Sequence, residues 1–134
     1  MPRVSAAFFA TGVIAVLVGM SFGMYMGSSE NFTLAAAHAH LNLVGWVTMA
    51  LYGTFYALTR GTMSTGLAWL HYVVSTLGVI VMITGLSLFL AHGNDKIYVP
   101  IMVPGEALTL LGMLLFAISV FRELFRARPS GGMA

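Results

Sequence analysis

The chain of 134 residues contains no cysteine. This absence excludes disulfide bonds, iron–sulfur clusters, thiolate metal sites and the covalent attachment of c-type haem. A metal ion or a metal-bearing cofactor would therefore be held by histidine, methionine or carboxylate side chains. The chain has four histidines, ten methionines and four acidic residues that could act as ligands.

Charge is also scarce. Asp, Glu, Lys and Arg make up 7% of the residues, whereas a soluble domain carries about 25%. Hydrophobic residues make up 59% of the chain, and its mean hydropathy is +0.93. This composition predicts an integral membrane protein. Four apolar runs, at residues 4–26, 35–58, 67–91 and 101–121, are each close to the ~20 residues that cross a ~30 Å hydrocarbon core.

The expected fold class is all-α: an integral membrane four-helix bundle. It forms one domain over residues 1–126, with a flexible C-terminal tail at residues 127–134 and no domain outside the membrane. Short connections make helices that follow one another antiparallel neighbours. The first run is too long for the core of a signal peptide and lacks a clear cleavage site, so we expect a retained helix.

Basic residues are concentrated on one side of the four expected helices. Because the side richer in Lys and Arg is cytoplasmic, both termini are expected in the cytoplasm, and the histidines 38, 40 and 92 at the outer side of the cell inner (plasma) membrane. The pI of about 9.3 comes from flanking arginines and does not indicate nucleic-acid binding, because no basic stripe is interleaved with aromatics. The basic residues are Arg3, Arg60, Arg122, Arg126 and Arg128 on the inner side and Lys96 on the outer.

Two histidines, His38 and His40, stand two residues apart at the head of the second apolar run. Ionisable groups are rare at membrane depth and tend to mark function. In a helix, residues i and i+2 are about 200° apart, so the two rings point to opposite sides. Ligands of one metal on a helix would rather be spaced i, i+4. The pair therefore indicates two separate binding sites.

A haem group suits this pattern, because neutral imidazole is a good axial ligand of haem iron. Asn42, Gly45 and Met49 share the side of His38, and Gly45 is expected to leave flat space for a porphyrin face. The alternative is that both histidines lie at the membrane interface and bind water or backbone carbonyls.

Of three other ionisable residues, His92 and Glu106 have two interpretations each and His71 has one. His92 is either a solvated loop residue or a group near a haem edge, where it is a further candidate metal ligand or a hydrogen-bond donor to one. His71, between Trp69 and Tyr72, resembles an interfacial aromatic belt. Glu106 either complements the dipole of the fourth helix from its first turn, or exchanges protons with a redox centre or binds an axial histidine.

The ten methionines allow a copper hypothesis, because soft sulfur ligands select Cu(I). Met20 and Met24 are spaced by four and share a helix face, and Met26 follows. Methionine is also common as a flexible filler of apolar cores. Both interpretations stay open at this point.

Glycines are spaced regularly in three of the four runs, which permits close approach of helices. In the first run Gly19, Gly23 and Gly27 are spaced by four, and the third and fourth runs have pairs spaced by seven. Outward histidines on two sides of one helix favour self-association, for which closed cyclic symmetry is the common outcome.

The start of the second run, His38-Ala39-His40-Leu41-Asn42 with Gly45-Trp46 after it, resembles the haem-bearing helices of subunit I of the haem–copper oxidase superfamily. That subunit has twelve helices in three arcs of four, related by pseudo-threefold symmetry. The second helix of one arc carries a His-x-His motif whose two histidines bind two haems on opposite sides. The resemblance implies that this chain is equivalent to one arc and forms a homotrimer.

The chain departs from that family at the oxygen-reducing site. The family holds copper with three histidines, two of them adjacent on the helix equivalent to the third run, and residues 82–91 offer no such pair. The paired arginines that hold haem propionates are missing, and Lys96 falls in the equivalent loop. Oxygen reduction by this chain alone is therefore not expected.

Together these features predict a b-type haem protein of the lipid bilayer, with His38 of one chain and His40 of its neighbour as axial ligands in a homotrimer. Two imidazoles suit electron transfer, and the electron donor and acceptor are not identified by the sequence. One alternative is a copper-binding or copper-transporting oligomer that uses the Met/His cluster. Another is a small assembly subunit whose histidines bind no cofactor.

Overall fold

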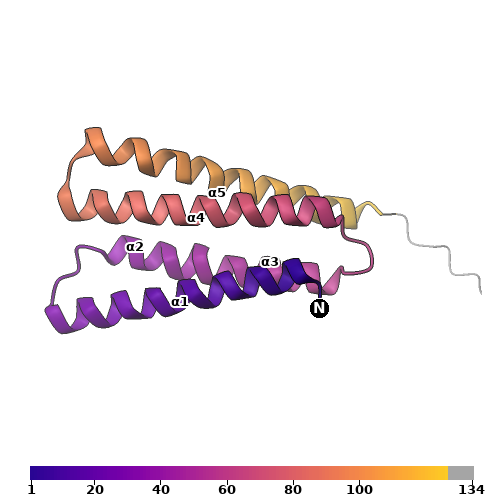
Figure 1. Ribbon diagram of the computed structural model, residues 1–134, viewed down its shortest axis with the longest axis horizontal. Helices are drawn as coiled ribbons and strands as arrows, with labels where there is room; N and C mark the ends of the chain where they lie inside the picture. Colours follow the sequence, from indigo (N-terminus) through magenta and orange to yellow (C-terminus); the bar gives the residue numbers. More distant parts are fainter. Residues whose placement is uncertain (127–134) are drawn as a thin grey trace, which may run out of the picture.

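In the computed structural model, which describes residues 1–126, the chain is helical between short loops (Figure 1). The elements are α1 (Arg3–Ser29), α2 (Ala35–His40), the π-helix η1 (Leu41–Thr48), α3 (Met49–Leu58), α4 (Thr65–His92) and α5 (Asp95–Leu124). Because α2, η1 and α3 are continuous, they form one rod, residues 35–58. The predicted tail at residues 127–134 lies outside the described residues.

Within residues 1–126, four helices are long and apolar enough to cross a membrane: α1, the rod, α4 and α5. The prediction of an all-α chain with four membrane-spanning helices is confirmed. The N-terminus, the loop of residues 59–64 and the last turns of α5 lie at one end, which we call the terminal end (Figure 1). The loops that join α1 to α2 and α4 to α5 lie at the other, which we call the histidine end.

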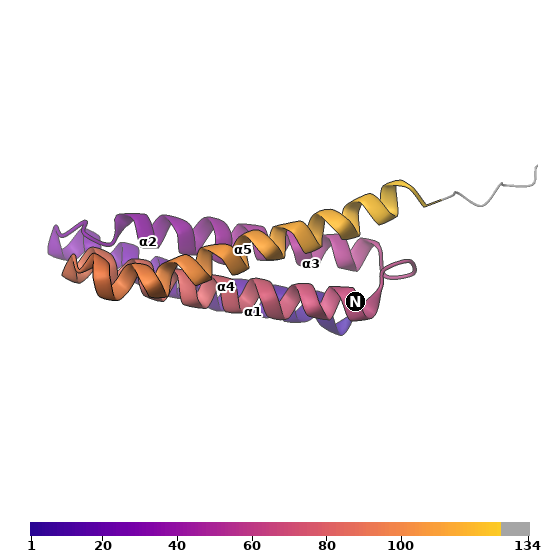
Figure 2. The same cartoon turned by 90° about the horizontal axis from the view of Figure 1, so that it is seen from above.

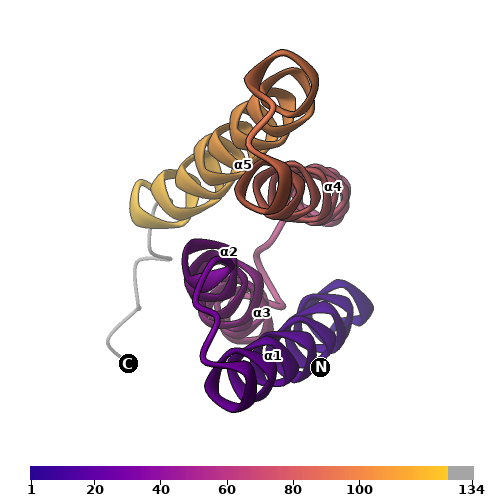
Figure 3. The same ribbon diagram turned by 90° about the vertical axis from the view of Figure 1, so that its left-hand side faces the viewer.

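The bundle is made of two helix pairs, and Figure 3 shows the pairs end on. In one pair α1 lies along the rod, and in the other α5 packs on α4. Most of the contact of α5 is with α4, but α5 runs at an angle to α4 (Figure 2), and its last turns approach the end of the rod, where Ser119 lies 3.0 Å from the Tyr56 hydroxyl. A large part of the surface of α5 is therefore open to lipid or to another copy.

Glycines make the contact between α4 and α5 close. A Cβ atom added at Gly85 would lie 2.6 Å from Met102 Cα, and one added at Gly78 would lie 2.7 Å from the backbone nitrogen of Thr109. A Cβ added at Gly105 would meet the backbone of Met82. The glycine pairs spaced by seven thus serve packing within the chain, as small residues commonly do between membrane helices.

Helix α5 begins at Asp95, six residues before the predicted start at residue 101. Asn94 has extended backbone angles before it, and the Asp95 carboxylate in the first turn complements the helix dipole. The helix continues through Pro100 and Pro104, as membrane helices often do. The prolines in the sequence therefore do not mark the start of the helix.

The segment η1 is a π-helix, whose hydrogen bonds join each residue to the fifth one before it. Within it the Thr48 hydroxyl donates to the carbonyl oxygen of Leu43 at 2.9 Å. π-Helices are rare and are frequent at functional sites. The segment follows His40 directly. The sequence prediction assumed α geometry along the whole rod and missed this change of periodicity.

Candidate functional site

His38 lies on α2 and is half-buried against α1. Its Nδ1 atom is 2.8 Å from the carbonyl oxygen of Gly19, and a Cβ added at Gly23 would lie 3.0 Å from the His38 ring. The regularly spaced glycines of α1 therefore make room for this imidazole. Because a carbonyl oxygen can only accept, Nδ1 carries the proton and Nε2 has the free lone pair.

Asn42, one turn further along the rod, faces this lone pair. Its Nδ2 atom is 3.2 Å from Nε2 of His38 and donates to it. The Oδ1 atom of Asn42 is buried without a hydrogen-bond partner among the described residues, and glycine at position 19 leaves the room for this amide. A metal ion bound at Nε2 of His38 would replace one hydrogen bond of the Asn42 amide.

His40 is exposed, on a different face of the rod from His38. Its Nδ1 donates to the carbonyl oxygen of Ala36 at 2.8 Å, so its Nε2 is again the nitrogen with the free lone pair. The exposed side chains of Leu43, Val47 and Leu51 continue this face toward the terminal end. We call residues 40, 43, 47 and 51 the His40 face; it is apolar apart from the imidazole.

The two rings therefore point in different directions, as their spacing predicts. The structure adds that His38 packs on α1 of its own chain. Only the exposed part of its ring is open to another molecule. The two histidines lie on two different surfaces of the protomer: the edge between α1 and α2 for His38, and the His40 face for the other.

Gly45 and Met49 lie inside the protomer. A Cβ added at Gly45 would lie 2.9 Å from Cβ of Ala15 and 3.5 Å from a methyl group of Val79, and Met49 is fully buried. The expectation of flat space for a porphyrin beside Gly45 is therefore wrong within the protomer. The glycine instead permits close approach of α1 and α4 to the rod.

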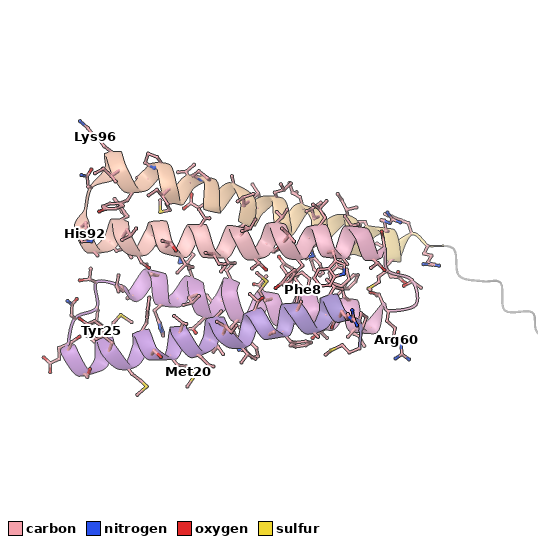
Figure 4. All side chains as sticks on the ribbon, in the orientation of Figure 1. Phe8, Met20, Tyr25, Arg60, His92 and Lys96 are labelled. Carbon is pink, nitrogen blue, oxygen red and sulfur yellow. The ribbon has the colours of Figure 1, made fainter. Side chains whose placement is uncertain are left out.

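His92 and Lys96 lie at the histidine end, but on the other helix pair (Figure 4). The His92 ring stacks on Tyr98 with centroids 5.6 Å apart, and both His92 and Lys96 are exposed. Within residues 1–126 no three His, Cys, Asp or Glu side chains gather closely enough to hold a metal ion. One protomer thus does not assemble a metal site of three such ligands.

Glu106 does not lie in the first turn of its helix, as the dipole interpretation required. It is the twelfth residue of α5, because that helix begins at Asp95, and its side chain is exposed. That interpretation is therefore wrong. Ionisable groups within membrane helices almost always face a bundle interior, a water-filled cavity or a charged partner. An exposed carboxylate here indicates that lipid alone does not cover this face of α5.

The three methionines of the copper hypothesis do not gather at one place. Met20 and Met24 are exposed on α1 (Met20 in Figure 4), whereas Met26 is only 4% exposed and packs in the core. A copper site on this helix could therefore use two thioethers from each chain. Further ligands would have to come from other residues or other copies.

The sequence interpretation of His71 as part of an interfacial belt is wrong. Its exposed fraction is 0%, and its Nδ1 atom is 3.0 Å from the Tyr56 hydroxyl. The same hydroxyl is 3.0 Å from Oγ of Ser119, which joins the rod, α4 and α5. The rings of Phe8 and Tyr52 pack on the imidazole at centroid distances of 5.0 and 4.4 Å.

One sequence signal could have revealed this burial. On α4 the buried residues include Ala68, His71, Ser75, Gly78 and Met82, which recur every three or four positions, as one face of a helix does. Because small residues dominate that face, it is the side on which other helices approach. Trp69 and Tyr72, which flank His71 in the sequence, are more exposed than His71. Their aromatic rings favoured the prediction of a position at the membrane interface.

The buried hydrogen bonds of Tyr56 predict a loss of stability when its hydroxyl is removed. Tyr56→Phe leaves Nδ1 of His71 without its partner in an apolar surrounding, which costs about 1–3 kcal/mol of unfolding free energy. Unfolding by SDS in detergent measures the loss. Tyr25→Phe is the control, because Tyr25 is 59% exposed, and it should change stability by less than about 0.5 kcal/mol. Equal effects of the two variants would contradict a structural role of the Tyr56–His71 pair.

Comparison with protein-family models, curated proteins and solved structures gave no match to this chain.

Proposed function

We propose that the chain binds haem b non-covalently, with His38 and His40 as the axial ligands, and transfers electrons. The observation that carries the proposal is the shared arrangement of the two rings. Each donates Nδ1–H to a backbone carbonyl at 2.8 Å, which leaves Nε2 as the nitrogen that can bind a ligand, although the Asn42 amide now donates to this atom of His38. Histidines that bind metals are commonly held in this way, since the second hydrogen bond fixes tautomer and ring orientation.

The proposed assembly is a homotrimer, in which the His40 face of one copy meets the α1–α2 edge of the next. The support is that the two histidines lie on two different surfaces of one protomer. An interface between two different surfaces is head-to-tail, and such interfaces form rings when the rotation between neighbouring copies closes. Three copies is the number that the resemblance to the oxidase subunit implies. Each contact between copies would then bring one His38 and one His40 together.

A haem held by His38 and His40 would supply one-electron chemistry. The residues of the chain hold this group in place. Asn42 can turn its amide away from Nε2 of His38, and Lys96 of a neighbouring copy can pair with a propionate. Gly45 and Met49 act indirectly, because their packing fixes the rod. With the positive-inside orientation, the site lies toward the outer side of the plasma membrane.

Glu106 is proposed to exchange a proton with this site. Gly105 packs on Met82, and Gly45 packs on Val79, three residues earlier on α4. Glu106 therefore lies within about one helical turn of the level of Gly45, in the half of the bundle that holds the histidine pair. Its exposed carboxylate is a suitable group to take up a proton when the centre gains an electron.

The variant Glu106→Gln tests this role through the reduction potential. A carboxylate near the centre disfavours the gain of an electron there, because it adds negative charge or must first take up a proton. The reduction potential of Glu106→Gln should therefore be higher than that of the wild type. An equal potential in the variant and the wild type would show that Glu106 does not act at this site.

The absorption spectrum of the purified protein tests the haem proposal itself. We expect a Soret band, iron and porphyrin in equal amounts, and a reduced spectrum that carbon monoxide does not shift. A colourless protein would overturn the proposal. A spectrum that carbon monoxide shifts readily would show an open coordination position and exclude two histidine ligands.

Copper is the second candidate, and the exposure of two thioethers on one face of α1 favours it. Met20 and Met24 are spaced by four and are 57% and 74% exposed. In that case the purified protein contains copper without porphyrin, and the variant Met20→Leu/Met24→Leu loses the metal. Metal analysis of the same sample therefore separates the two candidates.

A further inference from the structure

A polar cavity of about 190 Å³ opens at the terminal end of the bundle. It lies where the end of α3, the loop of residues 59–64, the start of α4 and the end of α5 come together. Its volume is several times the ~30 Å³ that one water molecule takes up in the liquid. Tyr56 and Ser119 also line it. The cavity has room for a small polar group.

Positive charge dominates the lining. Arg122, in the last turn of α5, and Arg126, two residues after the end of that helix, both line the cavity, and Glu123 is the one acidic residue there. The guanidinium of Arg126 is held in place, because its Nη1 donates to the carbonyl oxygen of Thr62 at 3.0 Å. A guanidinium has five N–H donors, so this bond leaves others available for a ligand.

The first turn of α4 adds further donors on the same side. Ser64, which lines the cavity, precedes this helix, and its side chain makes no capping hydrogen bond. The first N–H groups of a helix have no partner within the helix, and its N-terminus attracts anions. This end of α4 therefore supports the two arginines in favouring a negatively charged group.

A shallow, open apolar groove begins beside the polar cavity. It follows one face of α5 to the end of that helix and is lined by Leu114, Ala117, Ile118, Phe121, Arg122 and Phe125. Arg122 lines both the cavity and the groove. A ligand that filled both would need an anionic head and an apolar tail that meet at this side chain.

We propose that the two together form a binding site for an anionic phospholipid. Its phosphate lies in the cavity between Arg122, Arg126 and the start of α4, and an acyl chain lies in the groove on α5. Free phosphate shares the head-group chemistry but has nothing to fill the groove. Basic pockets at the membrane surface commonly bind anionic head groups. This site is independent of the histidine pair, which lies at the other end of the bundle.

Lipid binding to the full chain in mild detergent tests the proposal. Phosphatidylglycerol, phosphatidylcholine and inorganic phosphate are added separately, and bound molecules are counted by native mass spectrometry. We expect one tightly bound phosphatidylglycerol per chain. The variant Arg122→Gln/Arg126→Gln should bind it roughly thirtyfold more weakly. Arg60→Gln is the matched control, because Arg60 is exposed at the same end (Figure 4) and does not line the cavity.

Ala117→Trp, which fills the groove, should weaken phosphatidylglycerol binding while both arginines remain. Circular dichroism checks that each variant keeps its helices. Equal binding of phosphatidylglycerol and phosphatidylcholine would overturn the proposal, as would an equal loss in Arg60→Gln. Inorganic phosphate that binds as tightly as the lipid would also overturn it, because the groove would then contribute nothing.

Discussion

On the proposed function, the variant His40→Ala is expected to lose bound haem. Nε2 of His40 is exposed, and its free lone pair is fixed by the bond from Nδ1 to Ala36. Replacing a residue that only hydrogen-bonds to a metal ligand typically lowers metal affinity by about 10–100-fold. Removal of the ligand itself should therefore weaken haem binding by more than roughly 100-fold. His38→Ala should have the same effect, since six-coordinate iron needs both rings.

Titration of the apoprotein with haem, followed at the Soret band, measures this loss. His92→Ala is the matched control, because His92 is exposed at the same end of the bundle but lies on the other helix pair. It should bind haem as the wild type does. Asn42→Ala removes the amide that occupies Nε2 of His38 and should retain binding. A spectrum that is unchanged in His38→Ala/His40→Ala would end the haem proposal, whatever the single variants do.

Gly105→Ala is expected to separate α5 from α4. The added Cβ would meet the backbone of Met82, and backbone atoms cannot move aside as the end of a flexible side chain can. Overpacking of this kind typically costs 1–3 kcal/mol, and occasionally more. The effect should be at the upper end of that range, because α5 packs chiefly on α4.

The free energy of unfolding in SDS, together with the protease sensitivity of α5, measures this change. Gly27→Ala is the control, because Gly27 lies within α1 and no atom is within 4 Å of an added Cβ. That substitution should stabilise α1 by up to about 1 kcal/mol, since alanine is a better helix former than glycine. If the Gly105→Ala protein were as stable as the wild type, the backbone around Met82 could move aside from the added Cβ at little cost in free energy.

The sequence predicted the membrane spans well, because length and hydropathy determine them. The rod at residues 35–58 has the predicted bounds, although its π-helix left no signal in the composition. The start of α5 was misplaced, because Pro100 was taken to end a loop and is instead inside the helix. Hydropathy is insensitive to both features, since neither depends on how apolar the residues are.

The site was harder to predict, because two of its properties depend on how the helices pack. The i, i+2 spacing fixed the divergence of the two histidine rings, but it could not show that α1 covers one of them. The space expected beside Gly45 is filled by Ala15 and Val79. The burial of His71 depends on three helices together. A periodic row of small residues on α4 was the only local sign of it.

The π-helix affects how one part of the rod can rotate relative to the other. Its wider turns lie between the imidazoles and the half of the rod nearer the terminal end, which Tyr56 and its neighbours anchor. A π-helical turn contains about one residue more than an α-helical turn. If one such turn tightened to α geometry, this extra residue would have to move into the helix on one side of the turn. The segment before it would then swivel about the rod axis by about 100°, the angle of one residue in an α-helix. His38 and His40 would turn together, and each would exchange the surface it now faces for another.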